Sequence, residues 1–200
     1  MKDVDIQARL FARIHGIERF LLQSFYTFWG RLKCRLMGVK LGRDVSFNGP
    51  IRIERFKHSR IEIGNNVTFN SNYVFNPRGS KTCILQTATD SAIIKIGDNC
   101  GLSGVSIVSW NSVKIHSHTM IGANVAIGDT DDHPERLYTE SEPIEIGKNV
   151  FIGMASLIMK GVTIGENTVI GAGSVVTKKL PSNVLAAGVP CKVIRKNESL

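Results

Sequence analysis

The chain has 200 residues, enough for one ordinary domain. Hydrophobic residues make up 42% and charged residues 21%, a globular rather than a disordered composition. The net charge of +8 is uneven, because residues 1–43 hold nine bases and three acids. No aromatic and basic recognition pattern occurs, so we expect no nucleic-acid partner.

The N-terminal segment, residues 1–40, is predicted to be helical. Apolar residues recur every three or four positions from Leu10 to Leu36, as in an amphipathic helix, although Gly16 and Gly30 leave two shorter helices as an alternative. Charged residues within it argue against a membrane span. We expect the segment to pack on the rest of the protein or on a neighbouring subunit. Weak contact with a membrane surface through its basic side chains is the less favoured alternative.

A six-residue period runs through most of the remaining chain. From Ile146 the sequence reads IGKNVF, IGMASL, IMKGVT, IGENTV and IGAGSV, with an aliphatic residue at every sixth position up to Val176. The same unit begins earlier at Ile63, Ile96 and Ile121. A strict period of six is neither helical nor that of a hairpin strand. It predicts a mainly β fold, a left-handed parallel β-helix with three hexapeptides in each coil.

Residue types within the repeat explain its corners. The first residue is aliphatic and the fifth is small or β-branched, and both are predicted to point inward. A corner between strands often needs a left-handed backbone, which asparagine and glycine tolerate best. The fourth residue of the unit is asparagine at Asn66, Asn99, Asn124, Asn149 and Asn167.

One interruption of the repeat predicts a loop. Ile127 and Ile146 are nineteen positions apart, where the next unit should follow after six. Residues 129–143 should therefore leave the coil, and loops on a rigid scaffold often carry function. The predicted β-helix domain spans residues 41–196.

The four cysteines indicate a reducing compartment. Their spacing contains no C-x-x-C pair and suggests neither a zinc site nor a disulfide framework. No secretory signal is visible. We expect a cytoplasmic protein, with peripheral attachment to the inner membrane surface as an alternative.

Two segments resemble a known family. The loop IGDTDDHP, residues 127–134, resembles the D-x-D-x-H-P loop of O-acetyltransferases that act on sugars and polysaccharides. The tail VIGAGSVVTKKLPSNVLAAGVPCKVIRK, residues 169–196, is similar to the CoA-binding end of maltose and galactoside acetyltransferases. The segment LMGVKLGRDV, residues 36–45, is more like capsule and surface-polysaccharide members. From about residue 61 to residue 196 the chain resembles the hexapeptide-repeat acyltransferases.

The resemblance implies that His133 is the catalytic base. Acetyl transfer to a hydroxyl requires removal of its proton, and imidazole titrates near neutral pH. A carboxylate on the second ring nitrogen would fix the tautomer. Asp131 is the first candidate for it and Asp129 the second, and Glu140 and Glu142 on the same loop stay open. Because no Cys or Ser adjoins the histidine in the motif, we expect direct transfer without an acyl-enzyme.

The resemblance also implies acetyl-CoA as the co-substrate. Gly153, Met154 and Ala155 match the turn along the pantetheine arm, although family members often have a polar residue in place of Met154. The other matching positions are Ala172, Thr177, Lys178, Lys192 and Arg195. Cations near a nucleotide phosphate make physical sense. Lys160 stands where the family often has proline.

The acceptor is expected to be a hydroxyl of a sugar or a surface-polysaccharide precursor. The residues assigned to it are Ser103, Trp110, Asn111 and Asp129, in the coils up to the loop. The family is usually trimeric, with active sites between subunits, so a homotrimer is expected. No metal is expected.

Three alternatives remain open. A γ-type carbonic anhydrase shares the fold and needs three zinc-binding histidines. His116, His118 and His133 would supply them, with the first two on one side of a strand, at a spacing unlike that family's. An N-acetyltransferase acting on a nucleotide-linked amino sugar is the second, and a non-catalytic scaffold is the third. The acceptor's identity and the length of the acyl chain are left undecided.

Overall fold

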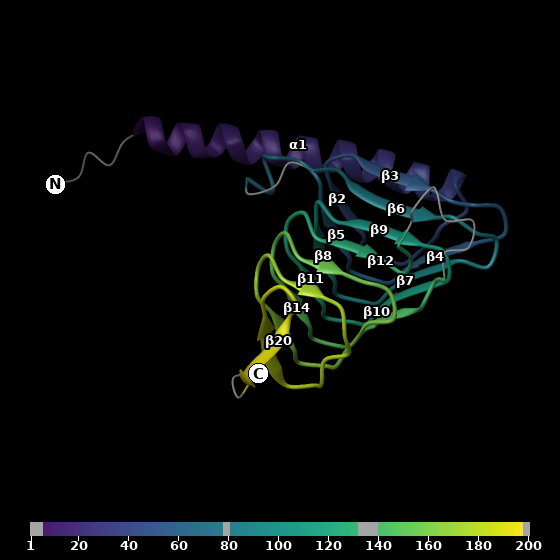
Figure 1. Cartoon of the computed structure of the whole chain (residues 1–200). Coiled ribbons are helices and arrows are strands. Elements are labelled where there is room, and N and C mark those ends of the chain that lie inside the picture. The colour runs from purple at the N-terminus through teal and green to yellow at the C-terminus, as the bar shows by residue number, and fades with distance from the viewer. Residues whose placement is uncertain (1–5, 78–80, 132–139, 198–200) are drawn as a thin grey trace.

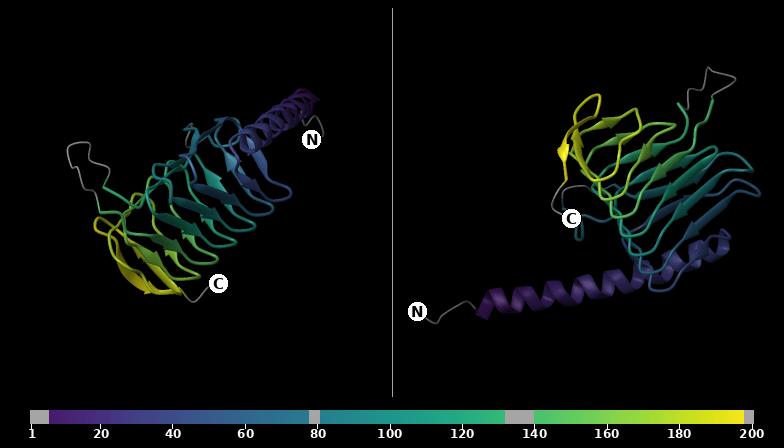
Figure 2. Two further views of the ribbon diagram at one scale, coloured as in Figure 1. Left: turned by 90° about the vertical axis from the view of Figure 1, so that its right-hand side faces the viewer. Right: turned by 90° about the horizontal axis from the view of Figure 1, so that it is seen from below.

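The protein is a three-sided parallel β-solenoid with a long helix across one end (Figure 1). The computed structural model describes residues 6–77, 81–131 and 140–197. The coils stack along one axis, with helix α1 at the N-terminal end and strand β20 at the other (Figure 2). The predicted fold class, a left-handed parallel β-helix preceded by a helical segment, is confirmed.

Three sheets form the sides of the solenoid, and we name them A, B and C in chain order. Sheet A contains β1 (Lys40–Leu41), β4 (Arg60–Ile63), β7 (Ile93–Ile96), β10 (Ser112–Ile115), β13 (Ile144–Ile146) and β16 (Thr163–Ile164). Sheet B contains β2 (Ser46–Asn48), β5 (Thr68–Asn70), β8 (Gly101–Ser103), β11 (Met120–Ile121), β14 (Phe151–Ile152), β17 (Val169–Ile170), β19 (Val184–Ala187) and β20 (Lys192–Lys196). Sheet C contains β3 (Ile51–Glu54), β6 (Cys83–Thr87), β9 (Ser106–Ser109), β12 (Ala126–Gly128), β15 (Leu157–Ile158) and β18 (Val175–Val176).

The inward aliphatic residues form columns along the axis. On sheet A the strand register places Ile63, Ile96, Ile115, Ile146 and Ile164 directly over one another. All five are buried. Burying one such side chain contributes about 1.5–3 kcal/mol. The six-residue period is therefore the repeat of the core itself.

The corners adopt the predicted left-handed backbone. We call them the AB, BC and CA corners after the sheets that they join. Asn66, Asn99, Asn149 and Asn167 occupy the AB corner with φ between 54° and 57°, and Asn124 occupies the BC corner with φ of 60°. Amide side chains bond along the AB corner, for example from Asn149 Nδ2 to Asn167 Oδ1 at 3.0 Å. These bonds tie successive coils together at the turn.

Helix α1 (Ile6–Leu36) is a single helix, so the alternative of two helices is wrong. Its C-terminal half covers the open end of the solenoid. Lys33 Nζ donates to the Ile51 carbonyl at 3.0 Å. Cys34 is fully buried, and burial raises the pKa of its thiol to about 12. Gly30 rests on the ring of Phe47, where a Cβ would lie only 2.5 Å from Cδ2.

The apolar stripe that predicted α1 faces away from the solenoid. Ile17, Leu21, Phe25, Phe28 and Leu36 are between 56% and 77% exposed. The sequence led us to expect packing on the body or on a neighbouring subunit, and within one chain this stripe does not pack on the body. Instead the cap is formed by the opposite side of the helix, where a glycine and a cysteine allow close approach.

The predicted loop leaves the stack at the CA corner. Strand β12 ends at Gly128 and β13 begins at Ile144, so residues 129–143 lie between two otherwise successive strands. The coil resumes its register after them, since Ile144 pairs with Val113 of the preceding coil. His133 lies outside the described residues.

Adding one methyl group at Gly30 should destabilise the protein. Gly30→Ala places a Cβ against the Phe47 ring, and we expect a loss of about 1–3 kcal/mol in the free energy of unfolding. Urea denaturation measures it. The matched control is Gly16→Ala in the same helix, where no atom lies within 4 Å and helix propensity improves. An equal effect of both substitutions would contradict the packing role of Gly30.

Candidate active site

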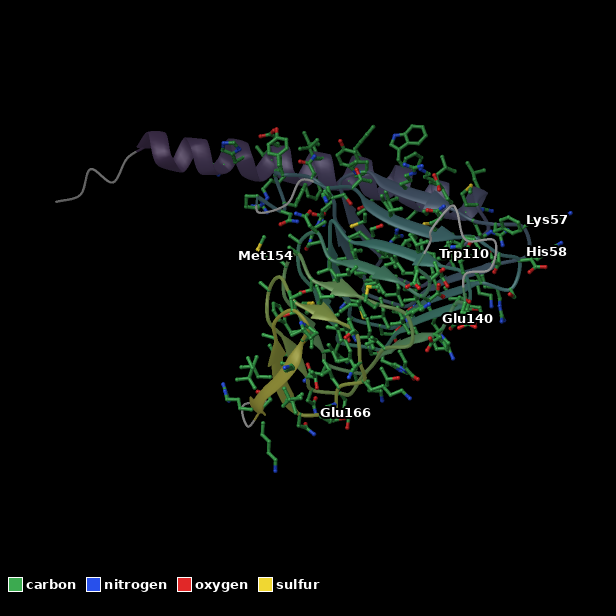
Figure 3. All side chains as sticks on the ribbon, in the orientation of Figure 1. Lys57, His58, Trp110, Glu140, Met154 and Glu166 are labelled. Carbon is green, nitrogen blue, oxygen red and sulfur yellow. The ribbon has the colours of Figure 1, made fainter. Side chains whose placement is uncertain are left out.

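Apart from Lys192 and Arg195 on β20, the predicted site residues of the described chain gather at two different corners. Trp110, Asn111, Asp129, Asp131, Thr177 and Lys178 lie at the CA corner. Ser103, Gly153, Met154, Ala155 and Ala172 lie at the BC corner. Figure 3 shows Met154 on the opposite side of the solenoid from Trp110 and Glu140. Sheet C separates the two sets.

Asp129 organises the CA corner. Its carboxylate is fully buried and accepts three hydrogen bonds, from Ser109 Oγ at 2.9 Å, Trp110 N at 2.7 Å and Asn111 N at 2.9 Å. Both oxygens are thus engaged by the preceding coil, and no part of the carboxylate is exposed to an acceptor. Asp129 positions the turn that carries Trp110 and Asn111. Nothing in the sequence pointed to its partner Ser109, which the fold brings over it from a position twenty residues earlier.

Lys160 joins the two described ends of the loop. Its Nζ donates to Asp131 Oδ2 at 2.6 Å and to the Glu140 carbonyl at 3.3 Å. The bond to Asp131 raises the pKa of the Lys160 ammonium. This contact gives a role to the residue that departs from the family's usual proline. Proline could make neither bond.

Close packing at the BC corner leaves small residues along its surface. Gly153 is buried, and a Cβ there would strike the backbone nitrogen of Ala172. Met154 accepts from the Gly173 nitrogen at 2.8 Å through its carbonyl, which joins successive coils. Ala155 and Ala172 are exposed beside these contacts. The surface of the BC corner in these two neighbouring coils is therefore formed largely by backbone atoms and small side chains.

Cationic side chains cover the last coil. Lys192 and Arg195 lie on β20, which pairs antiparallel with β19 and is exposed along its whole length. Lys178 and Lys179 are exposed at the CA corner. Ammonium and guanidinium groups on an open strand and corner can reach phosphates.

The two corners are too far apart for one chain to join them directly. Ala155 and Lys160 mark the ends of the sheet C side, five residues apart along extended chain. At 3.3 Å per residue that distance is about 16 Å. A compact ligand therefore cannot contact both corners of one chain, and only an extended ligand could span them.

The two histidines of the carbonic anhydrase alternative lie on different faces. His116 Nε2 is 2.8 Å from Glu145 Oε1 on the outside of sheet A. His118 turns the AB corner with φ of 63° and lines a hollow with Met120 and Phe151 on sheet B. The expectation that both face one side of a strand is therefore wrong. Within the described ranges no three metal-binding side chains come together.

Another hollow among the described residues lies on the outer face of sheet A. It has a volume of about 650 Å³. Lys40, Glu62, Lys95, Lys114 and Glu145 line it in successive coils. These charges come from neither predicted set, and we assign the hollow no ligand.

Comparison with known proteins supports the interpretation of the repeats. Residues 143–178 match the family model described as bacterial transferase hexapeptide (six repeats). The chain is 49% identical over 98 residues to the galactoside O-acetyltransferase of Escherichia coli, covering 46% of this chain and 48% of that protein. It is 41% identical over 98 residues to the galactoside O-acetyltransferase of Lactococcus lactis, with 46% and 47% coverage.

Among solved structures, a variant of AntD matches with a TM-score of 0.65 and 20% identity, covering 84% of this chain and 90% of that chain. AntD is an N-acyltransferase from Bacillus cereus, in complex with dTDP-4-amino-4,6-dideoxyglucose and coenzyme A. At this identity the likeness shows the fold alone.

Together these findings show hexapeptide repeats over residues 143–178, within a chain that forms a parallel β-solenoid. The predicted resemblance to galactoside acetyltransferases is confirmed. The chain spans about half the length of these curated relatives.

Removing the Asp129 carboxylate should destabilise the CA corner. Asp129→Ala leaves three donors without their charged acceptor, and we expect a loss of about 3 kcal/mol in the free energy of unfolding. Urea denaturation measures it. The control is Asp90→Ala, an exposed aspartate at the CA corner two coils earlier. Equal free energies of unfolding for the two variants would contradict the structural role of Asp129.

Proposed function

We propose that this protein transfers an acetyl group from acetyl-CoA to a hydroxyl of a sugar or a surface-polysaccharide precursor. One observation carries the proposal. The first three residues of the D-x-D-x-H-P sequence, 129–131, lie at the CA corner, where Asp129 holds the exposed Asn111 and the half-buried Trp110 in place. The relatives named galactoside O-acetyltransferases support acetyl transfer to a hydroxyl.

His133 acts as the general base in this proposal. It takes the proton from the acceptor hydroxyl as the oxygen attacks the thioester carbonyl. The tetrahedral intermediate collapses, the C–S bond breaks, and the CoA sulfur leaves with the proton that the imidazole returns. A backbone N–H in a water-poor cleft stabilises the oxyanion. No acyl-enzyme is formed.

Asp131 remains the proposed partner of the His133 ring. Lys160 holds one of its two oxygens, Oδ2. A carboxylate fixed on one side is better placed to hold a single histidine tautomer with its other oxygen. Lys160 is thus a positioning residue in the proposal, and Asp129 acts through the Trp110 turn rather than on the substrate.

The residues of the BC corner and the last coil suit CoA. Gly153, Ala155 and Ala172 offer backbone groups beside small side chains, which suits an extended pantetheine arm. Lys192 and Arg195 supply exposed positive charge for its phosphates. Thr177 and Lys178 complete the proposed set from the CA corner. CoA's thioester supplies the activated acetyl group.

A homotrimer accounts for the separation of the two corners. Cyclic symmetry places one subunit's CA corner against the BC corner of its neighbour in a heterologous contact. The base and the acceptor-binding residues of the CA corner then come from one chain, and much of the CoA site comes from the next. Acetyl-CoA as co-substrate and four free, buried cysteines fit a cytoplasmic enzyme.

Loss of His133 should abolish turnover without abolishing acetyl-CoA binding. We expect His133→Asn to lower kcat about 10²–10⁴-fold, the usual contribution of a general base. Thiol release from acetyl-CoA is measured against sugars, oligosaccharides and nucleotide-linked amino sugars. His118→Asn is the matched control, because asparagine fills the same left-handed position in other coils.

Equal activity of the His133 and His118 variants would exclude His133 as the base. If only nucleotide-linked amino sugars are acetylated, the acceptor is an amine and the proposed hydroxyl acceptor is wrong. An absence of both turnover and acetyl-CoA binding in the unaltered protein would favour a non-catalytic scaffold.

Subunit sharing predicts complementation between two inactive variants. His133→Asn removes the base, and Ala172→Arg places a bulky side chain on the exposed BC corner. Each is expected to be inactive alone. Co-expression should restore activity, because some interfaces in mixed trimers combine an intact CA corner with an intact BC corner. Mixed trimers without any activity would place the whole site within one chain.

A further inference from the structure

Helix α1 carries a second apolar surface that the solenoid does not use. We call the outward set Ile17, Leu21, Phe25, Phe28 and Leu36 the α1 stripe. The residues follow one another at spacings of four, four, three and eight, so they lie along one line of the helix. Each is more than half exposed. An apolar line of this length on a protein surface marks an interaction site.

The stripe cannot be a displaced part of the cap, because the capping side of α1 is already in place. Thr27 Oγ1 accepts from the Phe47 nitrogen at 3.1 Å, and Arg31 Nε donates to the Val45 carbonyl at 3.2 Å. Cys34 is buried on the same side. The stripe therefore points away from the solenoid, and α1 lies across the terminal face of the molecule (Figure 1).

Positive charge is concentrated on helix α1, although Arg31 and Lys33 bind the solenoid. Within residues 6–36 the sequence has six bases and one acid. Residues 1–43 carry +6 of the total of +8, which leaves +2 for the other 157 residues. Arg13 and Arg35 flank the stripe, at helical spacings of four before Ile17 and seven after Phe28. Neither side chain makes a hydrogen bond or an ion pair with the residues that the structure describes.

We propose that the α1 stripe docks the protein on the surface of an anionic lipid bilayer. Aromatic and aliphatic side chains would enter the headgroup boundary, while the flanking arginines meet lipid phosphates and carboxylates. Phe20 and Trp29, 67% and 52% exposed, widen the apolar side with aromatic rings. The contact is peripheral, since no helix in the described ranges is long and apolar enough to cross a membrane.

Charge argues against a second copy of α1 as the occupant. Pairing two stripes would bring the flanking arginines of both helices together, with Glu18 as the only acid of each helix to offset them. A bilayer with anionic headgroups supplies the missing negative charge. Docking would hold the solenoid against the membrane by its N-terminal end, with the last coil and its cations farthest from the surface.

The test is co-sedimentation of the full chain with vesicles, in the absence of any substrate. Phosphatidylcholine vesicles with about 30% phosphatidylserine are compared with pure phosphatidylcholine. We expect binding to the anionic vesicles only, weakened by salt. Leu21→Asp/Phe25→Asp should lower the partition coefficient at least tenfold. Arg13→Gln/Arg35→Gln should lower it severalfold.

Phe56→Asp/Tyr73→Asp is the matched control, because it changes charge equally at two exposed aromatic residues outside α1. It should bind vesicles slightly less than the unaltered chain. Three results would overturn the proposal: no binding by the unaltered chain, equal loss in the control, or a fall in oligomer mass in the α1 variant without vesicle binding. The last would assign the stripe to a second copy. Because no turnover is measured, these results are independent of the proposed reaction.

Discussion

The structure depends on the stacking of one coil on the next. An inward isoleucine lies over its counterpart in the preceding coil, as Ile96 lies over Ile63 and under Ile115. Parallel backbone hydrogen bonds require the coils to keep the same register, and the corners must turn at the same height each time. Asn99 and Asn167 do this with φ near 57°. Core, register and corner geometry are thus one constraint, and its period is six residues.

That constraint acts on the inward residues and the corner backbone, so side chains and insertions on the outer side of the corners can vary. The stack accepts the insertion after Gly128 because the strands on both sides keep their partners, Ile127 with Ile158 and Ile144 with Val113. Asp129 fixes the point of departure by binding the corner of the coil before. Lys160 then connects the two described ends of the loop. A few polar contacts thereby join this long insertion to the rigid scaffold.

The capping side and the outward side of helix α1 differ in the size of their residues. Close approach decides which side forms the cap. Gly30 lets the Phe47 ring sit against the helix backbone, and Cys34 is small enough to be buried there. The larger residues, such as Phe25 and Phe28, lie outside. A bulky stripe would hold the helix farther from the coil and leave the capping hydrogen bonds of Thr27 and Lys33 unmade.

The sequence by itself determined the solenoid, because its period is local and repeats through the chain. It also determined the asparagine corners, whose left-handed φ follows from residue type, and the interval of the inserted loop. Only the tertiary structure decided which side of α1 forms the cap, because the apolar period marks the outward side and the cap is made through Thr27, Gly30 and Cys34. It also decided that Asp129 binds a corner, that Lys160 reaches Asp131, and that the predicted site residues fall on two corners. These contacts join residues about twenty to thirty positions apart, and their geometry depends on how one coil lies on another.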